Sequence, residues 1–238
     1  MSTPAPTGRP DGSAPTVPAP SHSWTVKVRE AAVEALPPEK LLPDGQPTYV
    51  ASWIYLFGVA SIASLIVTVV SGSILAVKGP NWWHQTGPGH FFNSIHLWSV
   101  ELFFFVMVVH LWGKYWMAAW RGGRMRVWVT GAIVFLVAVP TAFTGYLSQQ
   151  NFDSQWISTQ SKDAINSTGL GSFFNVLNFG QMYGWHVLLL PVAVIILVAA
   201  HVLLVRNHGV VPPFELHERP ELAGTGDGRA APGPEVHS

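Results

Sequence analysis

The sequence predicts an all-α membrane protein: a four-transmembrane-helix bundle with an N-terminal amphipathic helix on the membrane surface. Of its 238 residues, 49% are hydrophobic and only 11% are charged, whereas a soluble domain carries about a quarter charged residues. Four apolar stretches of 20 or more residues are each long enough to cross a bilayer core of roughly 30 Å as a helix. The 11 Trp residues fit membrane interfaces, where Trp gathers. These features argue against an ordinary soluble enzyme.

Charge and cysteine content narrow the classes further. The 13 basic and 13 acidic residues give a net charge of zero, which argues against a nucleic-acid partner, because such proteins carry a basic excess. The chain has no cysteine. Disulfides, iron–sulfur clusters and a cofactor attached through a C-x-x-C-H motif are therefore excluded. Any metal or cofactor must be held by His, Met, carboxylate or backbone groups.

The two ends of the chain differ from its centre. Residues 1–23 hold six prolines within the first twenty positions, and we expect a disordered tail that cannot bury enough surface to offset its ordering entropy. No basic start leads into an apolar run, so no signal peptide is expected. Residues 24–38 begin with WTVKVREAAVEAL, whose near-helical spacing and closing Pro-Pro pair predict an amphipathic surface helix. Residues 50–211 are the predicted four-helix domain, and residues 212–238 a flexible tail.

The predicted spans run from about Trp53 to Val77, Phe91 to Trp116, Val127 to Leu147 and Tyr183 to Val205. Basic residues near the span ends mark the cytoplasmic side. Five lie on one side, namely Lys114, Arg121, Arg124, Arg126 and Arg206, and two on the other, Lys78 and Lys162. We therefore expect a multi-pass protein of a prokaryotic cell membrane with both termini in the cytoplasm.

Four histidines lie in two of the spans, in matched pairs. His96 and His110 are 14 residues apart in the second span, and His186 and His201 are 15 apart in the fourth. Each pair is separated by about 21–22 Å along its helix and stays on one broad helix face. A single intramembrane histidine is most often an interhelical hydrogen-bonding residue, but the duplicated spacing favours a shared role.

The direction of the spans decides which histidines share a level. The second and fourth spans both run from outside to inside, so His96 and His186 lie at the outer level and His110 and His201 at the inner level. One imidazole from each helix at each depth predicts two bis-histidine haems stacked across the bilayer, because neutral imidazole suits haem iron. Without cysteine both haems are non-covalent, b-type groups. With both axial positions filled, they move electrons and do not bind oxygen.

Glycines repeat the interval on the other two spans. Gly58 and Gly72 are 14 residues apart in the first span, as are Gly131 and Gly145 in the third. A glycine lets a porphyrin edge or another backbone approach closely. Small residues also pack membrane helices in general, but the shared interval favours contact with the haems. By this reasoning, a Gly113→Leu change at the cytoplasmic end of the second span should matter less for haem binding.

Short motifs surround these positions: S-I-H-L-W at 94–98, W-V-T-G at 128–131, F-T-G-Y at 143–146, and Y-G-W-H at 183–186 followed by Pro191. With the four histidines, they make the chain resemble the N-terminal half of cytochrome b in its short split form, cytochrome b6, over about residues 24–215. The resemblance implies that the four histidines bind haem iron and that the four glycines contact the haems. It also implies an electron-transfer subunit, inactive alone, of a quinol–cytochrome c or quinol–plastocyanin oxidoreductase, with quinone or quinol as substrate.

The resemblance implies partners as well. The P-E-W-Y signature of the quinol site belongs to the C-terminal half of cytochrome b, a three-helix subunit that the chain lacks. We expect that subunit as a partner, together with a Rieske iron–sulfur protein, a c-type cytochrome and membrane lipid, in a homodimeric complex.

The chain departs from the family pattern at the ends of the bundle. Asn93 and Gly113 stand where the family often has arginines that pair with haem propionates. After T-G-Y, next to the outer quinol site, the chain reads L-S-Q-Q-N-F rather than S-L-P-W. We therefore assign cofactor contacts to Lys114 and Arg206 at the inner ends of their spans, and to His208, which could donate a proton to an inner quinone.

Other readings stay open. The altered outer loop favours a di-haem b membrane anchor that links another redox partner or a dehydrogenase to the quinone pool. A haem-free transport or scaffold bundle is disfavoured by the duplicated spacings. Glu101, an acidic residue well inside a span, lies about 140° around the helix from His96 and is expected away from the haem. His84 and His90 are expected to be loop residues rather than ligands.

Overall fold

The computed structural model describes residues 24–37, 39 and 53–211, so the predicted tails at 1–23 and 212–238 lie outside the described residues. The chain divides into two compact units, Met1–Pro43 and Asp44–Ser238. In the first unit, helix α1 spans Trp24–Ala35, where the sequence predicted a helix, and none of its residues is buried. Its place on a membrane surface stays a prediction.

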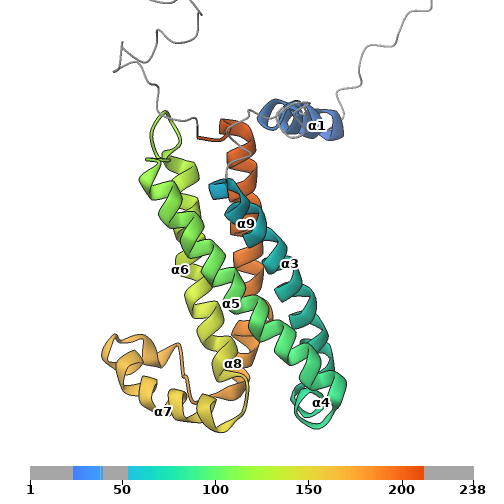
Figure 1. The fold of residues 1–238 in the computed structure, drawn as a ribbon, viewed down its shortest axis with the longest axis vertical. Helices are drawn as coiled ribbons and strands as arrows, with labels where there is room; N and C mark the ends of the chain where they lie inside the picture. The colour runs from blue at the N-terminus through green and yellow to red at the C-terminus, as the bar shows by residue number, and fades with distance from the viewer. Residues whose placement is uncertain (1–23, 38, 40–52, 212–238) are drawn as a thin grey trace, which may run out of the picture. The chain divides into compact units, whose positions relative to one another are not determined.

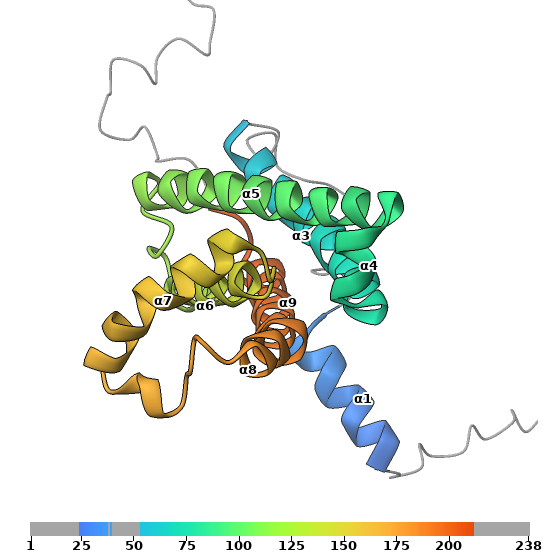
Figure 2. The same ribbon diagram turned by 90° about the horizontal axis from the view of Figure 1, so that it is seen from below.

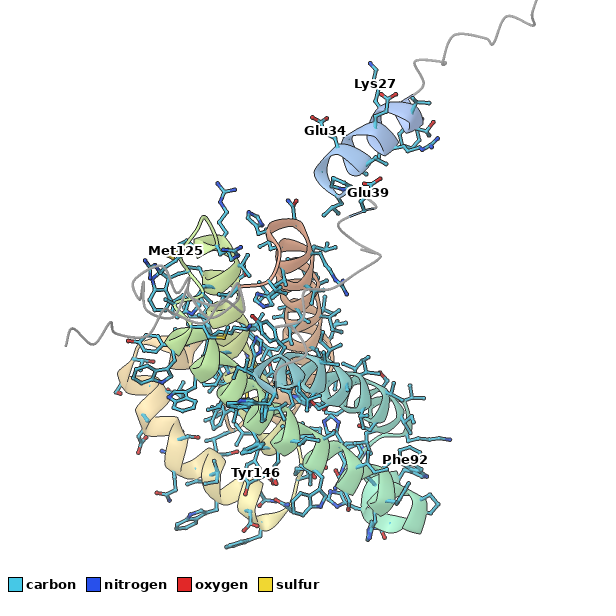
Figure 3. The ribbon with its side chains drawn as sticks, turned by 45° about the horizontal axis from the view of Figure 1, so that its top comes forward. Lys27, Glu34, Glu39, Phe92, Met125 and Tyr146 are labelled. Atoms are coloured by element: carbon cyan, nitrogen blue, oxygen red, sulfur yellow. The ribbon has the colours of Figure 1, made fainter. Side chains whose placement is uncertain are left out.

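Four long apolar helices make up the second unit. They are α3 (Trp53–Lys78), α5 (Gly87–Trp116), α6 (Met125–Leu147) and a composite of α8 (Phe179–Gly184), the π-helix η3 (Trp185–Leu189) and α9 (Leu190–His208). Each is long and apolar enough to cross a membrane. α3 and α6 run in one direction and α5 and α9 in the other (Figure 1). Phe92, early in α5, and Met125, at the start of α6, lie at opposite ends of the bundle (Figure 3). The predicted four-helix membrane bundle is confirmed.

Two shorter helices lie in connections that the sequence analysis treated as loops. They are α4 (Pro80–Gln85), between α3 and α5, and α7 (Phe152–Ser167), which follows α6 and precedes the 3₁₀ turn η2 (Leu170–Ser172). Both lie at the end of the bundle where α5 begins, which we call the α4 end, and they occupy different sides of it (Figure 2). Neither helix contains an apolar run long enough to cross a membrane, so the sequence did not predict either as a transmembrane span.

Local capping explains where the helices begin. The hydroxyl of Thr86 accepts a hydrogen bond from the backbone N–H of Gly89 at 3.0 Å and starts α5. The Asn151 side chain does the same for α7 by accepting from Ser154 N–H at 2.8 Å. At the opposite end of the bundle, two consecutive glycines with positive φ, Gly122 and Gly123, turn the chain from α5 into α6.

The tightest packing in the bundle lies at the middle of the spans. Phe103 and Met107 of α5 and Val134 and Ala138 of α6 form a buried cluster. Partly buried apolar side chains from all four spans pack against it: Leu65, Phe104, Phe135, Leu197 and Val198. On every span, these positions fall between the two histidines or the two glycines singled out in the sequence. A packed apolar layer, which we call the middle layer, therefore separates the two histidine levels.

Truncating the middle layer should destabilise the bundle. Phe103 is only 6% exposed, and Phe103→Ala should lower the free energy of unfolding by about 3–5 kcal/mol because it leaves a cavity in a packed layer. Phe105→Ala is the matched control on the same helix, since Phe105 is 63% exposed. Denaturation in detergent monitored by circular dichroism measures both. Equal losses in the two variants would mean that this layer is not the core of the bundle.

Candidate functional site

Each of the four predicted histidines lies against one of the four predicted glycines on a neighbouring helix. The pairs are Gly58–His110, Gly72–His96, Gly131–His201 and Gly145–His186. A Cβ atom built at Gly72 would lie 2.8 Å from Cε1 of His96, and one at Gly58 would lie 3.0 Å from Cε1 of His110. Such approaches are closer than side chains tolerate, so each glycine forms a notch that holds an imidazole. We call these four positions the glycine notches.

The notches pair the helices two by two. Two of them join α3 to α5, and two join α6 to the composite fourth span. The sequence analysis assigned these glycines to a cofactor edge, whereas the structure shows that they first make room for an imidazole ring. The residue spacing in the sequence singled out these four glycines. It carries no information on which atom of a neighbouring helix fills the space beside each glycine.

Backbone carbonyls near the notches orient three of the imidazoles, and one of the three carbonyls is that of Val127, beside His201. Nδ1 of His96 lies 3.0 Å from the carbonyl oxygen of Thr68, and Nδ1 of His186 lies 2.8 Å from that of Thr141. Each carbonyl belongs to the residue four positions before the glycine of its notch. Because a carbonyl only accepts hydrogen bonds, Nδ1 carries the proton in both rings. Nε2 therefore keeps its lone pair, as a metal ligand must.

Hydroxyl groups next to the notches add a second contact in two cases. Oγ of Ser71, the residue before Gly72, lies 3.2 Å from Nδ1 of His96. Oγ1 of Thr130, the residue before Gly131, lies 3.2 Å from Nδ1 of His201. Both hydroxyls donate to carbonyls of their own helix, so their oxygens are available to accept from the imidazole.

His110 differs from the other three histidines. Its Nδ1 is buried and has no hydrogen-bond partner among the described residues. The residue before its notch is Phe57, which carries no hydroxyl. This asymmetry could not be read from the spacing of the histidines, because it depends on the contact across two helices.

At the α4 end, two imidazoles face each other. The ring centroids of His96 and His186 are 6.0 Å apart, and the ring planes are inclined at 78°. Both rings line a cavity of about 750 Å³, which Gly72 and Gly145 also line. This volume lies in the range of sites that bind sizeable ligands. The structure thus brings together the two histidines that the sequence placed at one level.

At the opposite end, a lysine accompanies the second pair of histidines. His110 and His201 lie close enough for their charges to interact with each other and with that of Lys114. The Lys114 ammonium lies 3.6 Å from the centroid of the Tyr55 ring, an arrangement that stabilises a cation. The Tyr55 hydroxyl donates to the carbonyl of Val211 at 2.5 Å and so connects the start of α3 to the residues after α9.

The other two residues assigned to cofactor contacts are placed differently. Arg206 is exposed on α9. Nδ1 of His208 hydrogen-bonds to the carbonyl of Leu204 in its own helix, at 3.0 Å. Their roles toward a cofactor or quinone stay predictions.

A π-helical turn explains the unequal histidine intervals. His186 lies in η3, and Pro191 follows directly in α9. Proline has no N–H to donate to the preceding turn, and a π turn accommodates an extra residue within a helix. The 15-residue interval of the fourth span therefore covers nearly the same rise as the 14-residue interval of α5. The sequence showed the unequal numbers, but not the turn that reconciles them.

The two departures from the family pattern at the α4 end are in direct contact. The amides of Asn93 and Gln149 exchange two hydrogen bonds, each 3.2 Å long. Nε2 of His84 donates to the Gln149 carbonyl at 2.7 Å, and Nε2 of His90 donates to the His84 carbonyl at 3.0 Å. Asn93 and Gln149 also line the cavity of the histidine pair. A neutral amide pair therefore lies at this cavity. His84 and His90, which were expected in a loop, lie in α4 and in the first turn of α5.

Two further residues have contacts that the sequence did not show. Glu101 is among the residues that line the cavity of His96 and His186. A Cβ at Gly113 would contact the side chain of buried Ile54. The relation of both residues to a haem stays a prediction.

Comparisons with known proteins agree with this architecture. The family described as Cytochrome b(N-terminal)/b6/petB matches residues 101–223, just over half of the chain. A "Cytochrome bc complex cytochrome b subunit" of Chlorobaculum thiosulfatiphilum is 25% identical over 205 residues, covering 75% of this chain and 46% of that protein. A "Menaquinol:cytochrome c reductase cytochrome b subunit" of Geobacillus thermodenitrificans is 22% identical over 187 residues, covering 69% of this chain and 84% of that one. The chain thus spans less than half of the Chlorobaculum protein's length.

A solved structure shows the same fold. A chain of "Hyperthermophilic respiratory Complex III" superposes with a TM-score of 0.61 at 20% identity, covering 82% of this chain and 57% of that chain. At this level of identity the likeness concerns the fold alone. Together with the family match over the second half of the bundle, the four apolar spans and the paired histidines, it leads to one conclusion: the chain is an integral membrane protein that belongs to the cytochrome b N-terminal/b6 family.

Proposed function

We propose that the chain is a di-haem cytochrome b subunit, which carries electrons across the membrane between a quinol-oxidising and a quinone-reducing site of a bc-type respiratory complex. One observation supports this most directly. His96 and His186 face each other across a cavity whose walls include their glycine notches. The same combination of histidine and glycine notch recurs at the level of His110 and His201.

The residues fit a haem. A bond from a metal to a histidine nitrogen is about 2 Å long, so two imidazoles on opposite sides of one metal atom have ring centres about 6 Å apart. The rings of His96 and His186 are 6.0 Å apart. Within residues 24–37, 39 and 53–211, no group of three or more His, Cys, Asp or Glu side chains gathers as a metal site. Two imidazoles alone suit an iron whose other four ligands come from a porphyrin.

The chain's own residues would do three things for such a group. The imidazoles of His96, His186, His110 and His201 would hold iron from two sides at each level. At His96, His186 and His201, carbonyls and hydroxyls at the notches would fix the ring orientation and leave Nε2 free to bind. The middle layer excludes water between the two levels and keeps them apart. When bound, each haem supplies one-electron exchange, while the protein supplies position and potential.

The charges suggest how the chain sits in the membrane. Lys114 and the basic residues at 121, 124, 126 and 206 gather at the end opposite α4, so we propose that this end is cytoplasmic and that both termini lie inside. Lys114 is placed beside the inner histidines and would pair with a carboxylate of the inner haem. Arg206 and His208 would serve the inner haem and an inner quinone. The four glycines would lie along both haems.

We propose a substrate and partners from the names of the relatives and from the family resemblance. The Geobacillus protein is named for menaquinol and cytochrome c, and we propose a quinol as electron donor here. A separate three-helix subunit would contribute the C-terminal half, beside a Rieske protein and a c-type cytochrome, in a dimeric complex.

A di-haem membrane anchor is the second candidate. The amide pair of Asn93 and Gln149 favours it, because it replaces the family pattern next to the outer quinol site. Co-purification separates the two functions. A Rieske protein and a P-E-W-Y subunit in the isolated complex support the first, and a dehydrogenase in their place supports the second.

The haem content is the first test of the proposed function. The purified chain should contain two non-covalent b haems, because it offers two pairs of imidazoles and no cysteine. A pyridine haemochrome assay with protein quantification measures the ratio, and acidic acetone should extract all of the haem. A ratio near one, or a c-type spectrum, contradicts the proposal.

The pairing of the histidines is the second test. His96→Ala and His186→Ala should remove the same haem, since their rings face each other, and His110→Ala and His201→Ala should remove the other. Redox titration of the visible α band identifies which haem is left. If the His186 variant lost the haem that depends on His110, the proposed pairing would be wrong.

The glycine notches provide the third test. Gly145→Ala places a methyl group in contact with Cε1 of His186 and 2.8 Å from its Nδ1, and overpacking of this kind typically costs about 1–3 kcal/mol. We expect haem binding at the α4 end to weaken about tenfold or more, with the other haem nearly intact. Gly184→Ala is the matched control, because a Cβ there meets nothing within 4 Å. Equal haem retention in the two variants would make Gly145 an ordinary packing residue.

A further inference from the structure

The four notches give their imidazoles unequal hydrogen bonds at Nδ1. His96 has a carbonyl and a hydroxyl within reach, His186 a carbonyl at 2.8 Å, and His201 a hydroxyl at 3.2 Å and the backbone of Val127. His110 has a buried Nδ1 with no partner among the described residues. The difference is confined to one of the four ligand positions and lies at the end opposite α4.

The distance of Nδ1 from the notch does not explain the difference. Nδ1 of His110 lies 3.2 Å from a Cβ built at Gly58, and Nδ1 of His96 lies 3.2 Å from one built at Gly72. Two acceptors at the His96 notch are absent at the His110 notch, namely the Thr68 carbonyl and the Ser71 hydroxyl. The hydroxyl depends on the residue before the glycine, which is Ser71 at one notch and Phe57 at the other. A hydroxyl at position 57 would stand as close to His110 as Ser71 stands to His96.

Such a hydroxyl would be able to donate its own proton to a backbone carbonyl. Ser71 Oγ donates to the carbonyl of Val67 four residues earlier at 2.7 Å, and so leaves its oxygen to accept from the imidazole. A serine at position 57 would find the carbonyl of Trp53 at the same offset within α3. The backbone of α3 therefore offers a carbonyl to the hydroxyl proton of a serine at position 57, and the serine oxygen could accept from His110.

An acceptor at Nδ1 changes the chemistry of the ligand. An imidazole that donates its Nδ1 proton becomes a more basic ligand at Nε2 and is fixed in orientation. Greater electron donation stabilises oxidised iron over reduced iron, and hydrogen bonding around a ligand is one of the means by which a protein sets a haem potential. A ligand without an acceptor leaves its haem easier to reduce.

We propose that the residue before Gly58 tunes the haem at the level of His110 through the imidazole held in that notch. Phe57 is thus a positioning residue that withholds an acceptor from His110 and keeps the haem of His110 and His201 at a higher potential than a hydroxyl there would. The proposal rests on the proposed di-haem function, and it adds a residue of α3 that touches neither the iron nor a substrate.

The experiment compares Phe57→Ser with Phe57→Ala in the purified full-length chain with its haems. Both variants remove the ring, and only the serine adds an acceptor. Redox titration should show that the serine variant has a lower potential than the alanine variant at the haem of His110. At a fixed applied potential, the ratio of oxidised to reduced haem should rise about tenfold, which is about 59 mV for one electron. The haem at the α4 end should titrate alike in both variants.

The outcomes separate this inference from the proposed function. Two haems in the unaltered chain, with equal potentials in the two variants, overturn the role of Phe57 alone. Equal loss of the haem from both variants also overturns it, because Phe57 would then act only by packing. Loss from the alanine variant with retention by the serine variant supports it. Absence of a second haem from the unaltered chain contradicts the proposed function itself.

Discussion

The contact between a glycine of one helix and an imidazole of the next is the constraint on which the rest of this bundle depends. A side chain at Gly72 or Gly145 would collide with an imidazole, and one at Gly58 or Gly131 would require the ring to shift. The same close approach brings Nδ1 of His96 and of His186 within hydrogen-bond distance of the facing backbone. Ring placement, tautomer and helix spacing are thus set by one kind of contact.

The packing of side chains differs along the length of the spans. Tight apolar packing occupies the middle of the bundle, between the two histidine levels. At the α4 end the helices leave a cavity large enough for a sizeable ligand. In a membrane, lipid tails are as apolar as the helix surfaces, so helices associate by close packing and hydrogen bonds rather than by the hydrophobic effect. A bundle of this kind can remain open at two levels if it is well packed between them.

The two ends of the bundle use different polar chemistry. The end opposite α4 holds a lysine over an aromatic ring beside two histidines. The α4 end has a neutral amide pair, and His84 of α4 donates a hydrogen bond to the backbone carbonyl of Gln149. Asn93 and Gln149 come from segments more than fifty residues apart, and each looks like an isolated departure from the family pattern. Their contact shows that the two departures are one feature of the site.

The sequence alone determined the membrane bundle, its four spans and the positions of the eight paired residues, because hydropathy over 20 residues and a repeated interval are properties of single helices. It also determined that α5 and the fourth span run in the same direction. Only the tertiary structure decided which glycine holds which histidine, and that Glu101 reaches the cavity of His96. It also revealed that a π turn at Trp185–Leu189 offsets the extra residue of the fourth span. The tertiary structure likewise revealed that Nδ1 of His110 has no hydrogen-bond acceptor among the described residues. Contacts between atoms of different helices cannot be read from the periodicity of residues within one helix.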